Sequence, residues 1–140
     1  KYLNRISGPL LDRIDIHIEI VPVPFEKLSC AKPTEHSEVI RERVIKARKI
    51  QEERFKENDG VHCNAQMSSK LLREHTKLSD TSQQLLKVAM QRLNLSARAY
   101  DRILKVARTI ADLDDAKDIQ VEHISEAINY RNLDREGWAG

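Results

Sequence analysis

The sequence has few aromatic residues, few cysteines and no long apolar run. Aromatic side chains make up 4% of its 140 residues, too few for the stacking surfaces with which many proteins bind single-stranded nucleic acid. The two cysteines and the lack of a signal-peptide pattern indicate a reducing, cytoplasmic setting without a disulfide. No apolar run is long enough to span a membrane. We therefore expect neither a disulfide-stabilised fold nor a membrane partner.

An excess of charge of one sign is also missing. Lys and Arg number 24 and Asp and Glu number 22, which gives a net charge of +2, so any site for nucleic acid or phosphate must be a local patch. His62 and Cys63 are adjacent, and no second pair follows at zinc spacing, which predicts no metal site. A basic run over residues 41–49 is balanced by nearby glutamates and is typical of a solvated face. Within this run, Arg43 remains a candidate contact for a phosphate backbone.

A turn and a strand are predicted near the start of the chain. Residues 8–9 are Gly-Pro, which forms turns, and residues 14–20 alternate apolar and polar side chains, as in a half-buried strand. Arg13 then lies at the mouth of the strand, where its planar guanidinium suits a phosphate from a neighbouring subunit. The alternative is an ordinary ion pair with Asp12 or Asp15.

The strand has no partner of comparable quality in the sequence. A strand needs neighbours to satisfy its edges, so the rest of its sheet is expected upstream, and the chain reads as a piece of a larger protein. Prolines between residues 22 and 33 predict an extended connection. We expect the end of a core domain over residues 1–24, a linker over 25–36 and a helical domain over 37–140.

Five helices are predicted after the linker, from N-cap residues and from apolar residues at helical spacing. They are expected over residues 37–56, 64–78, 79–93, 96–115 and 121–131, with Ser37, Asn64, Ser79 and Ser96 as N-caps. The third is expected to be the most buried, and the fourth is the clearest amphipathic helix. The expected fold class is therefore mostly α, a four- to five-helix bundle preceded by one orphan β-strand.

The fourth predicted helix has basic residues on its polar side. At roughly 100° per residue, its apolar positions centre opposite Arg98, and Arg102 and Lys105 share the side of that arginine. Arg98 lies in the first turn, where the helix macrodipole disfavours a cation by about 0.3–1 kcal/mol. Either Asp101 pairs with Arg98, or the helix N-terminus and Arg98 together hold a phosphate. Arg102 and Lys105 are further candidate contacts for phosphate or DNA.

Four blocks occur in one order along the chain: SGPLLDRIDI, RVIKARKIQEERF, LSARAYDRILKVARTIADL and HISEAINYR. In this order they resemble the C-terminal part of the magnesium-chelatase-like AAA+ ATPases, in particular the competence-protein branch called ComM or YifB. The resemblance implies that residues 1–24 end the ATPase core and that the helices form the lid. It also implies that Arg13 is the arginine finger, acting in trans on the γ-phosphate held by the adjacent subunit, and that Arg98 is the second sensor of the nucleotide.

The resemblance implies an activity of an assembly rather than of this chain alone. It implies a homohexameric ring in the cytoplasm that uses ATP and Mg²⁺ to remodel DNA, by branch migration in recombination or natural transformation. The sequence lacks a GxxxxGK[ST] loop and an apolar strand that ends in a paired Asp-Glu, which would hold the phosphates and magnesium. We therefore expect the chain alone neither to hydrolyse ATP nor to bind it tightly.

Two other functions remain open from the sequence. The first is the motor subunit of magnesium chelatase, which drives magnesium insertion into a porphyrin. The second is a non-catalytic helical module that binds no nucleotide and only holds partners together.

Overall fold

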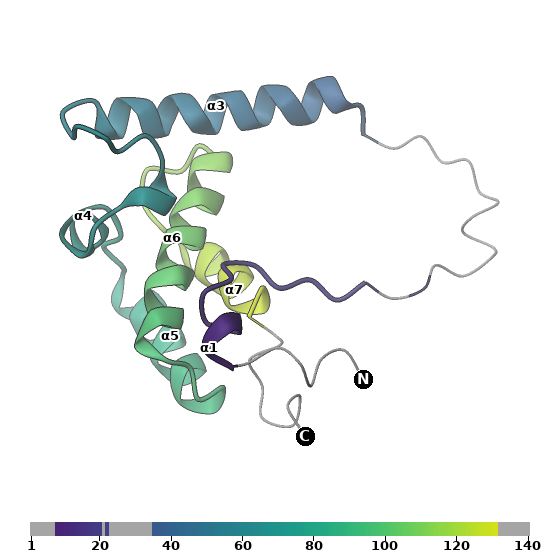
Figure 1. Cartoon of the computed structure of the whole chain (residues 1–140), viewed down its shortest axis with the longest axis vertical. Coiled ribbons are helices and arrows are strands. Elements are labelled where there is room, and N and C mark those ends of the chain that lie inside the picture. The colour runs from purple at the N-terminus through teal and green to yellow at the C-terminus, as the bar shows by residue number, and fades with distance from the viewer. Residues whose placement is uncertain (1–7, 21, 23–34, 132–140) are drawn as a thin grey trace.

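The computed structural model describes residues 8–20, 22 and 35–131. They form α1 (Gly8–Leu11), α3 (Ser37–Phe55), the 3-10 turn η2 (Asn64–Gln66), α4 (Ser69–His75), α5 (Asp80–Arg92), α6 (Ala97–Leu113) and α7 (Val121–Asn129). Figure 1 shows α3 lying across one end of α6, with α4 and α5 along one side of α6 and α7 on the other. The predicted helical bundle is confirmed.

The central element of the bundle is α6, and this differs from the expectation that α5 would be the most buried helix. Eight residues of α6 are buried, against two of α5, and α6 packs against α3, η2, α4 and α7. Apolar residues recur on one broad side of α6, so that side meets all of these elements. The core is formed by Phe55 from α3, Leu86 from α5, Ile103 and Ala107 from α6, and Ile124 from α7.

Serine side chains fix the starts of two of the predicted helices. Ser79 Oγ accepts a hydrogen bond from the backbone N of Ser82 at the start of α5. Ser96 Oγ accepts one from the backbone N of Ala99, at 3.2 Å, at the start of α6. Each bond satisfies one of the amide groups that a helix N-terminus leaves without an intrahelical partner. The predicted caps at these two positions are confirmed.

Two other predicted N-caps are wrong. Ser37 is the first residue of α3, and the cap position is held by His36, whose side chain makes no capping hydrogen bond. Asn64 begins only the short turn η2, and the next helix starts later, with Ser68 as the cap of α4. The side chain of Asn64 is buried and bonds to other helices, so it cannot also cap its own segment.

The expected strand over residues 14–20 is not formed. Among the described residues, β pairing is limited to an isolated bridge between Leu78 and Ile119. The expected burial is not found either, because Ile14, Ile16 and Ile18 are exposed while His17 is buried. A ladder needs a second strand, and the described part of the chain offers none beside this segment. Residues 8–11 likewise form the short helix α1 rather than a simple turn.

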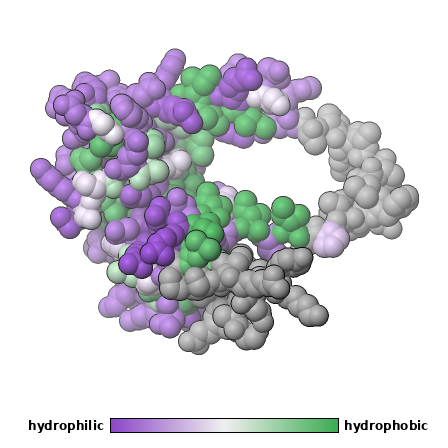
Figure 2. All heavy atoms as spheres, in the orientation of Figure 1, coloured by the Kyte–Doolittle hydropathy of each residue, from purple (hydrophilic) through white to green (hydrophobic). Residues whose placement is uncertain are grey.

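Apolar side chains also remain exposed on the first half of α3. Val39, Ile40, Val44 and Ile45 are each 40–49% exposed, whereas the buried residues of α3 all lie at or after Ala47. Figure 2 shows apolar atoms along the N-terminal segment and on the side of α3 that faces it. Only the second half of α3 packs into the bundle. Most of the expected linker, residues 25–34, and residues 132–140 lie outside the described part.

Candidate functional site

The segment that carries Arg13 is tied to the start of α6 by an ion pair. Arg102 Nη1 lies 2.6 Å from Asp15 Oδ1, and both side chains are partly exposed, at 33% and 43%. Just before this pair, the backbone N of Arg13 donates to the carbonyl oxygen of Leu10 at 3.0 Å, which closes a tight turn. Asp15, two residues after Arg13, is therefore bound to α6 by this ion pair.

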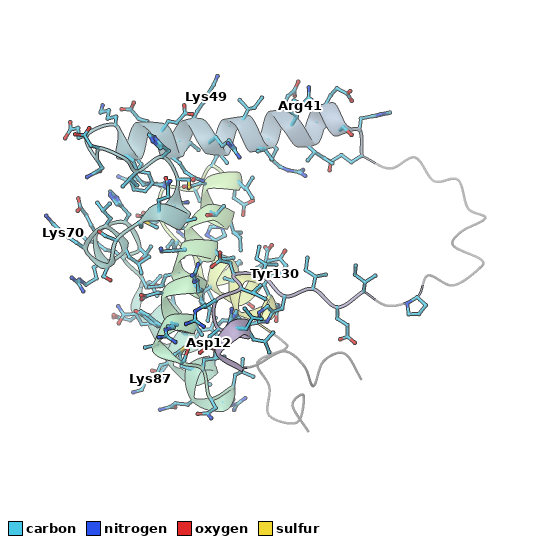
Figure 3. All side chains as sticks on the ribbon, in the orientation of Figure 1. Asp12, Arg41, Lys49, Lys70, Lys87 and Tyr130 are labelled. Carbon is cyan, nitrogen blue, oxygen red and sulfur yellow. The ribbon has the colours of Figure 1, made fainter. Side chains whose placement is uncertain are left out.

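The same segment is held a second time by the end of α7. Arg131 is fully buried; its Nη1 donates to the carbonyl oxygen of Ile14, and its Nη2 lies 3.9 Å from Asp12 Oδ1. The backbone N of His17 donates to the carbonyl oxygen of Tyr130 at 2.8 Å. Figure 3 shows Asp12 and Tyr130 in this region, where the N-terminal segment meets α7.

These contacts surround Arg13 in the sequence. Asp12 and Ile14 lie beside Arg131, and Asp15 lies beside Arg102. The side chain of Arg13 itself is exposed. The bundle thus fixes the backbone on both sides of Arg13, whose side chain stays accessible to solvent.

Arg98 is exposed in the first turn of α6, as the helical pattern predicted. It makes no hydrogen bond or ion pair with any residue in the described part of the chain, so the proposed pairing with Asp101 is not formed. The positive end of the helix dipole lies beside this cation and disfavours it. Free amide groups of the same turn attract anions. Together, the amides and Arg98 are suited to an anionic group.

The other predicted phosphate contacts have partners within the chain. Lys105 Nζ donates to the carbonyl oxygen of Ala65 at 2.8 Å. Arg43 donates through both terminal nitrogens to the carboxylate of Glu35, at 3.0 and 3.1 Å, on the exposed surface of α3. Arg102 holds Asp15, as described above. Among the bundle cations predicted to contact phosphate, only Arg98 makes no hydrogen bond or ion pair with another described residue.

A buried polar network joins the far end of α6 to α3 and η2. The fully buried carboxylate of Asp112 accepts from Arg54, from Asn64 Nδ2 at 2.7 Å and from Arg108 Nε at 3.1 Å. Arg108 also donates to the carbonyl oxygens of residues 116 and 117, at 2.7 and 2.9 Å. Burial lowers the pKa of the Arg108 guanidinium, and the charge of Asp112 opposes this effect.

Sequence reasoning missed this network. The side chain of Arg54 is only 12% exposed, although this arginine lies in a helix rich in exposed charged residues. A usable signal was present, since Arg108 and Asp112 are four residues apart in α6, a spacing that suits an ion pair. The partner carboxylate belongs to a helix more than fifty residues after Arg54, so the spacing around Arg54 does not indicate it.

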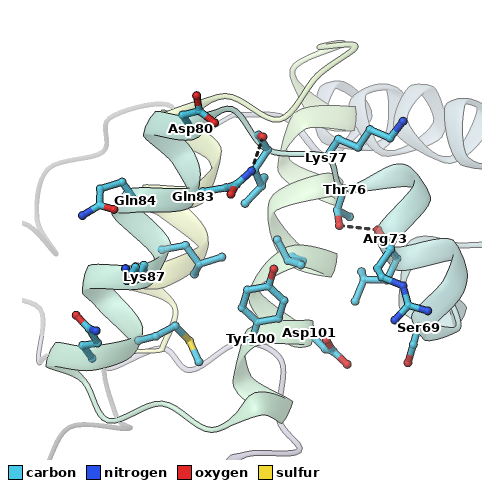
Figure 4. A pocket seen from close by; sticks show the side chains of 16 residues that line it. Ser69, Arg73, Thr76, Lys77, Asp80, Gln83, Gln84, Lys87, Tyr100 and Asp101 are labelled. Atoms are coloured by element: carbon cyan, nitrogen blue, oxygen red, sulfur yellow. Dashed lines mark hydrogen bonds between the residues drawn. The ribbon is translucent and has the colours of Figure 1, made fainter.

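An open groove of about 960 Å³ lies between α4, α5 and α6. Figure 4 shows Lys87 and Tyr100 on opposite walls of this groove. Its charged lining residues carry both signs, which gives the groove no strong preference for an anion or a cation; they are Arg73, Lys77, Asp80, Lys87 and Asp101. Arg98 does not line it, so the groove is separate from the arginines described above.

Within residues 8–20, 22 and 35–131, no group of three or more His, Cys, Asp or Glu side chains is arranged to hold a metal ion. In the same ranges, no helix has both the length and the apolar character that membrane crossing requires.

Comparison with known families identifies the bundle. Residues 34–131 match the family described as magnesium chelatase, subunit ChlI C-terminal. The chain belongs to this family. Residues 1–28 match a second family profile, described as magnesium chelatase, subunit ChlI.

Curated relatives narrow the type of protein. Competence protein ComM of Haemophilus influenzae is 43% identical over 136 residues, which cover 96% of this chain and 26% of ComM. YifB of Escherichia coli is 41% identical over the same length, and a Mycobacterium tuberculosis protein is 34% identical over 131 residues. The chain spans about a quarter of the length of the curated relatives it matches. It is a magnesium-chelatase-like AAA+ chain of the ComM and YifB type.

Proposed function

We propose that this chain is the C-terminal part of a ring-forming AAA+ ATPase, comprising the end of the ATPase core and the helical lid. In the intact homohexamer, Arg13 acts as the arginine finger on the nucleotide held by the neighbouring subunit. Arg98 contacts the nucleotide of its own subunit. The observation that supports this best is that Arg13 is exposed within a segment that Arg102 and Arg131 hold against the lid.

The proposed roles follow from the electrostatics of phosphoryl transfer. Negative charge spreads over the γ-phosphoryl oxygens in the transition state, and guanidinium groups that are already in place stabilise it without reorganisation. A finger arginine is worth about 10³ to 10⁵ in rate. At the start of α6, a triphosphate accepts hydrogen bonds from the free amides, and its negative charge compensates for the unfavourable position of Arg98 beside the positive end of the helix dipole. ATP and Mg²⁺ are cofactors of the full-length protein, whose phosphate-binding loop is not among these residues.

We propose that ATP turnover by the ring drives DNA remodelling in the cytoplasm, by branch migration in recombination or natural transformation. The similarity to a protein named for competence supports this choice. A second candidate, the ATPase motor of magnesium chelatase, is supported by the descriptions of both matching families. Branched DNA should stimulate the ATPase of the purified full-length protein in the first case. Chelatase partner subunits should stimulate it in the second.

The finger and sensor roles are tested by turnover in the full-length protein. We expect Arg13→Ala to lower the rate of ATP hydrolysis by about 10³-fold and Arg98→Ala to lower it at least about tenfold, because both remove charge stabilisation from the γ-phosphate. Arg41→Ala removes an exposed arginine of α3, labelled in Figure 3, and serves as the matched control with unchanged turnover. Unchanged turnover in both Arg13→Ala and Arg98→Ala would instead favour the non-catalytic helical module.

A further inference from the structure

Arg98 and Arg102 are one turn apart on the same side of α6. The helix is capped by Ser96 and has eight buried residues, so these two arginines move as one rigid unit. Arg102 is bonded to Asp15 at 2.6 Å, and Asp15 is two residues after Arg13. Within one chain, Arg98 is therefore connected to Arg13 through the backbone of α6, the ion pair between Arg102 and Asp15, and the short segment from Asp15 to Arg13.

The second attachment of the segment comes from the helix packed on α6. Arg131 follows α7, and α6 and α7 form the most extensive helix pair in the bundle. Because Arg131 is fully buried, its guanidinium has little freedom, and it reaches both the carbonyl oxygen of Ile14 and the vicinity of Asp12. The positions on either side of Arg13 are thus set by two helices of the lid.

We propose that Arg102 and Arg131 are positioning residues that place Arg13 according to the nucleotide state sensed by α6. The inference rests on the proposed function. A displacement of α6 that brings Arg98 to a phosphate carries Asp15 along through Arg102, and so moves the finger that serves the next subunit. Nucleotide in one site then changes hydrolysis in the neighbouring site, which is a coupling between two sites through one movable element.

The partly exposed pair between Arg102 and Asp15 suits this role better than a role in stability. Ion pairs that water reaches add little to the free energy of folding. They still orient the groups they join, because the hydrogen-bonded guanidinium fixes the direction of the carboxylate. Loss of the pair should therefore affect turnover and cooperativity while the fold remains intact.

The test uses the full-length protein and the variants Asp15→Asn, Arg102→Gln and the charge exchange Asp15→Arg with Arg102→Asp. We expect each single variant to lower kcat about 3- to 30-fold and to reduce the Hill coefficient for ATP towards one. KM should stay within about twofold, since Arg98 is retained, and the melting temperature should match that of the wild type. The charge exchange should restore both kcat and the Hill coefficient. Arg131→Lys keeps the charge but loses the planar fork, and should lower kcat and the Hill coefficient as the single variants do.

A matched control is the exposed pair between Lys56 and Glu53, which has the same 2.6 Å separation. Glu53→Gln should leave kcat and the Hill coefficient unchanged. The coupling proposal alone is overturned if Asp15→Asn and Arg102→Gln behave as the wild type while Arg13→Ala abolishes turnover, or if the charge exchange restores nothing. If Arg13→Ala retains full turnover, the finger assignment and the coupling proposal both fail.

Discussion

The two ends of α6 treat the same type of side chain in opposite ways. Near its C-terminus, Arg108 is 3% exposed and donates to Asp112 and to two backbone carbonyls. At its N-terminus, Arg98 is exposed and forms no polar contact with the described residues. A buried arginine with several acceptors serves the fold, because its charge is tolerated only when paired. An exposed arginine beside free helix amides is available to an anion.

The contrast extends to what each end of α6 joins. The buried network links α6 to α3 and η2 through Arg54 and Asn64. The exposed end links α6 to the segment that carries Arg13, through the pair between Arg102 and Asp15. The C-terminal end of α6 is held by buried hydrogen bonds and ion pairs, whereas the ion pair at its N-terminal end is partly exposed to water. The experiments below test whether stability depends on the first and activity on the second.

The largest expected effect on stability comes from Asp112→Ala. It leaves Arg54 and Arg108 buried without their carboxylate, which should lower the free energy of unfolding by about 3–5 kcal/mol. Urea denaturation of the chain measures this. Asp101→Ala, on the same helix, has no such buried partners and should change the value by less than about 0.5 kcal/mol. An equal loss of unfolding free energy in Asp112→Ala and Asp101→Ala would show that the buried network does not stabilise the C-terminal end of α6 more than the N-terminal end.

A smaller loss is expected from Ser96→Ala, which removes the N-cap of α6. One amide at the exposed end then loses its hydrogen bond to a side chain, at a cost of about 1 kcal/mol. The same denaturation experiment applies, with Ser125→Ala as a control because Ser125 is exposed within α7. A value for Ser96→Ala that matches the control would show that the cap does not stabilise this end.

The pH dependence of stability should involve His75, whose ring packs edge-on against Phe55 with the ring centres 5.5 Å apart. Burial lowers the pKa of His75 in the folded state; the charge of Glu74 opposes this effect, and the charges of Arg54 and Arg108 add to it. The unfolded state then binds the proton more tightly. The stabilisation is complete above the unfolded pKa of about 6.5 and is lost as the pH falls through and below it.

His75→Gln should therefore flatten the loss of stability on acidification. The free energy of unfolding of the wild type and of His75→Gln is compared at about pH 7.5 and about pH 5.5, on either side of the ordinary histidine pKa. The wild type should lose more stability between these two values than the variant. The same pH dependence in both proteins would contradict the assignment to His75.

The smallest effect on stability is expected from Arg98→Ala. Removing a cation from the first turn should leave the free energy of unfolding unchanged or raise it, by at most about 1 kcal/mol. A residue that does not stabilise the fold but is needed for turnover has a functional role. A loss of stability comparable to that of Asp112→Ala would instead make Arg98 a structural residue.

Signals that lie within one or two helical turns were predictable from the sequence. The caps Ser79 and Ser96 and the outward position of Arg98 on α6 were predicted and are confirmed. These depend on local hydrogen bonds and on helical periodicity. The resemblance to the magnesium-chelatase-like family likewise depends on four blocks of sequence that occur in one order along the chain.

Features that depend on distant partners were not predictable in this way. Asn64 looks like an N-cap, but its side chain bonds to Asp112, 48 residues later. The isoleucines of residues 14–20 alternate as in a strand, but no second strand pairs with them in the described part of the chain. The apolar density of α5 suggested the most buried helix, yet part of α5 borders an open groove. A pattern indicates which residues prefer burial but not which neighbour covers them.

The central claim is that Arg13 serves the neighbouring site while Arg98 serves its own, and mixed assemblies test it most directly. Arg13→Ala and Arg98→Ala subunits of the full-length protein, each with lowered turnover alone, are mixed and reassembled before ATP turnover is measured. Turnover should recover at on the order of one site in four, because a site is complete where an Arg13→Ala subunit binds the nucleotide and an Arg98→Ala neighbour supplies the finger. Mixed rings that are no more active than rings of Arg98→Ala subunits alone would contradict it.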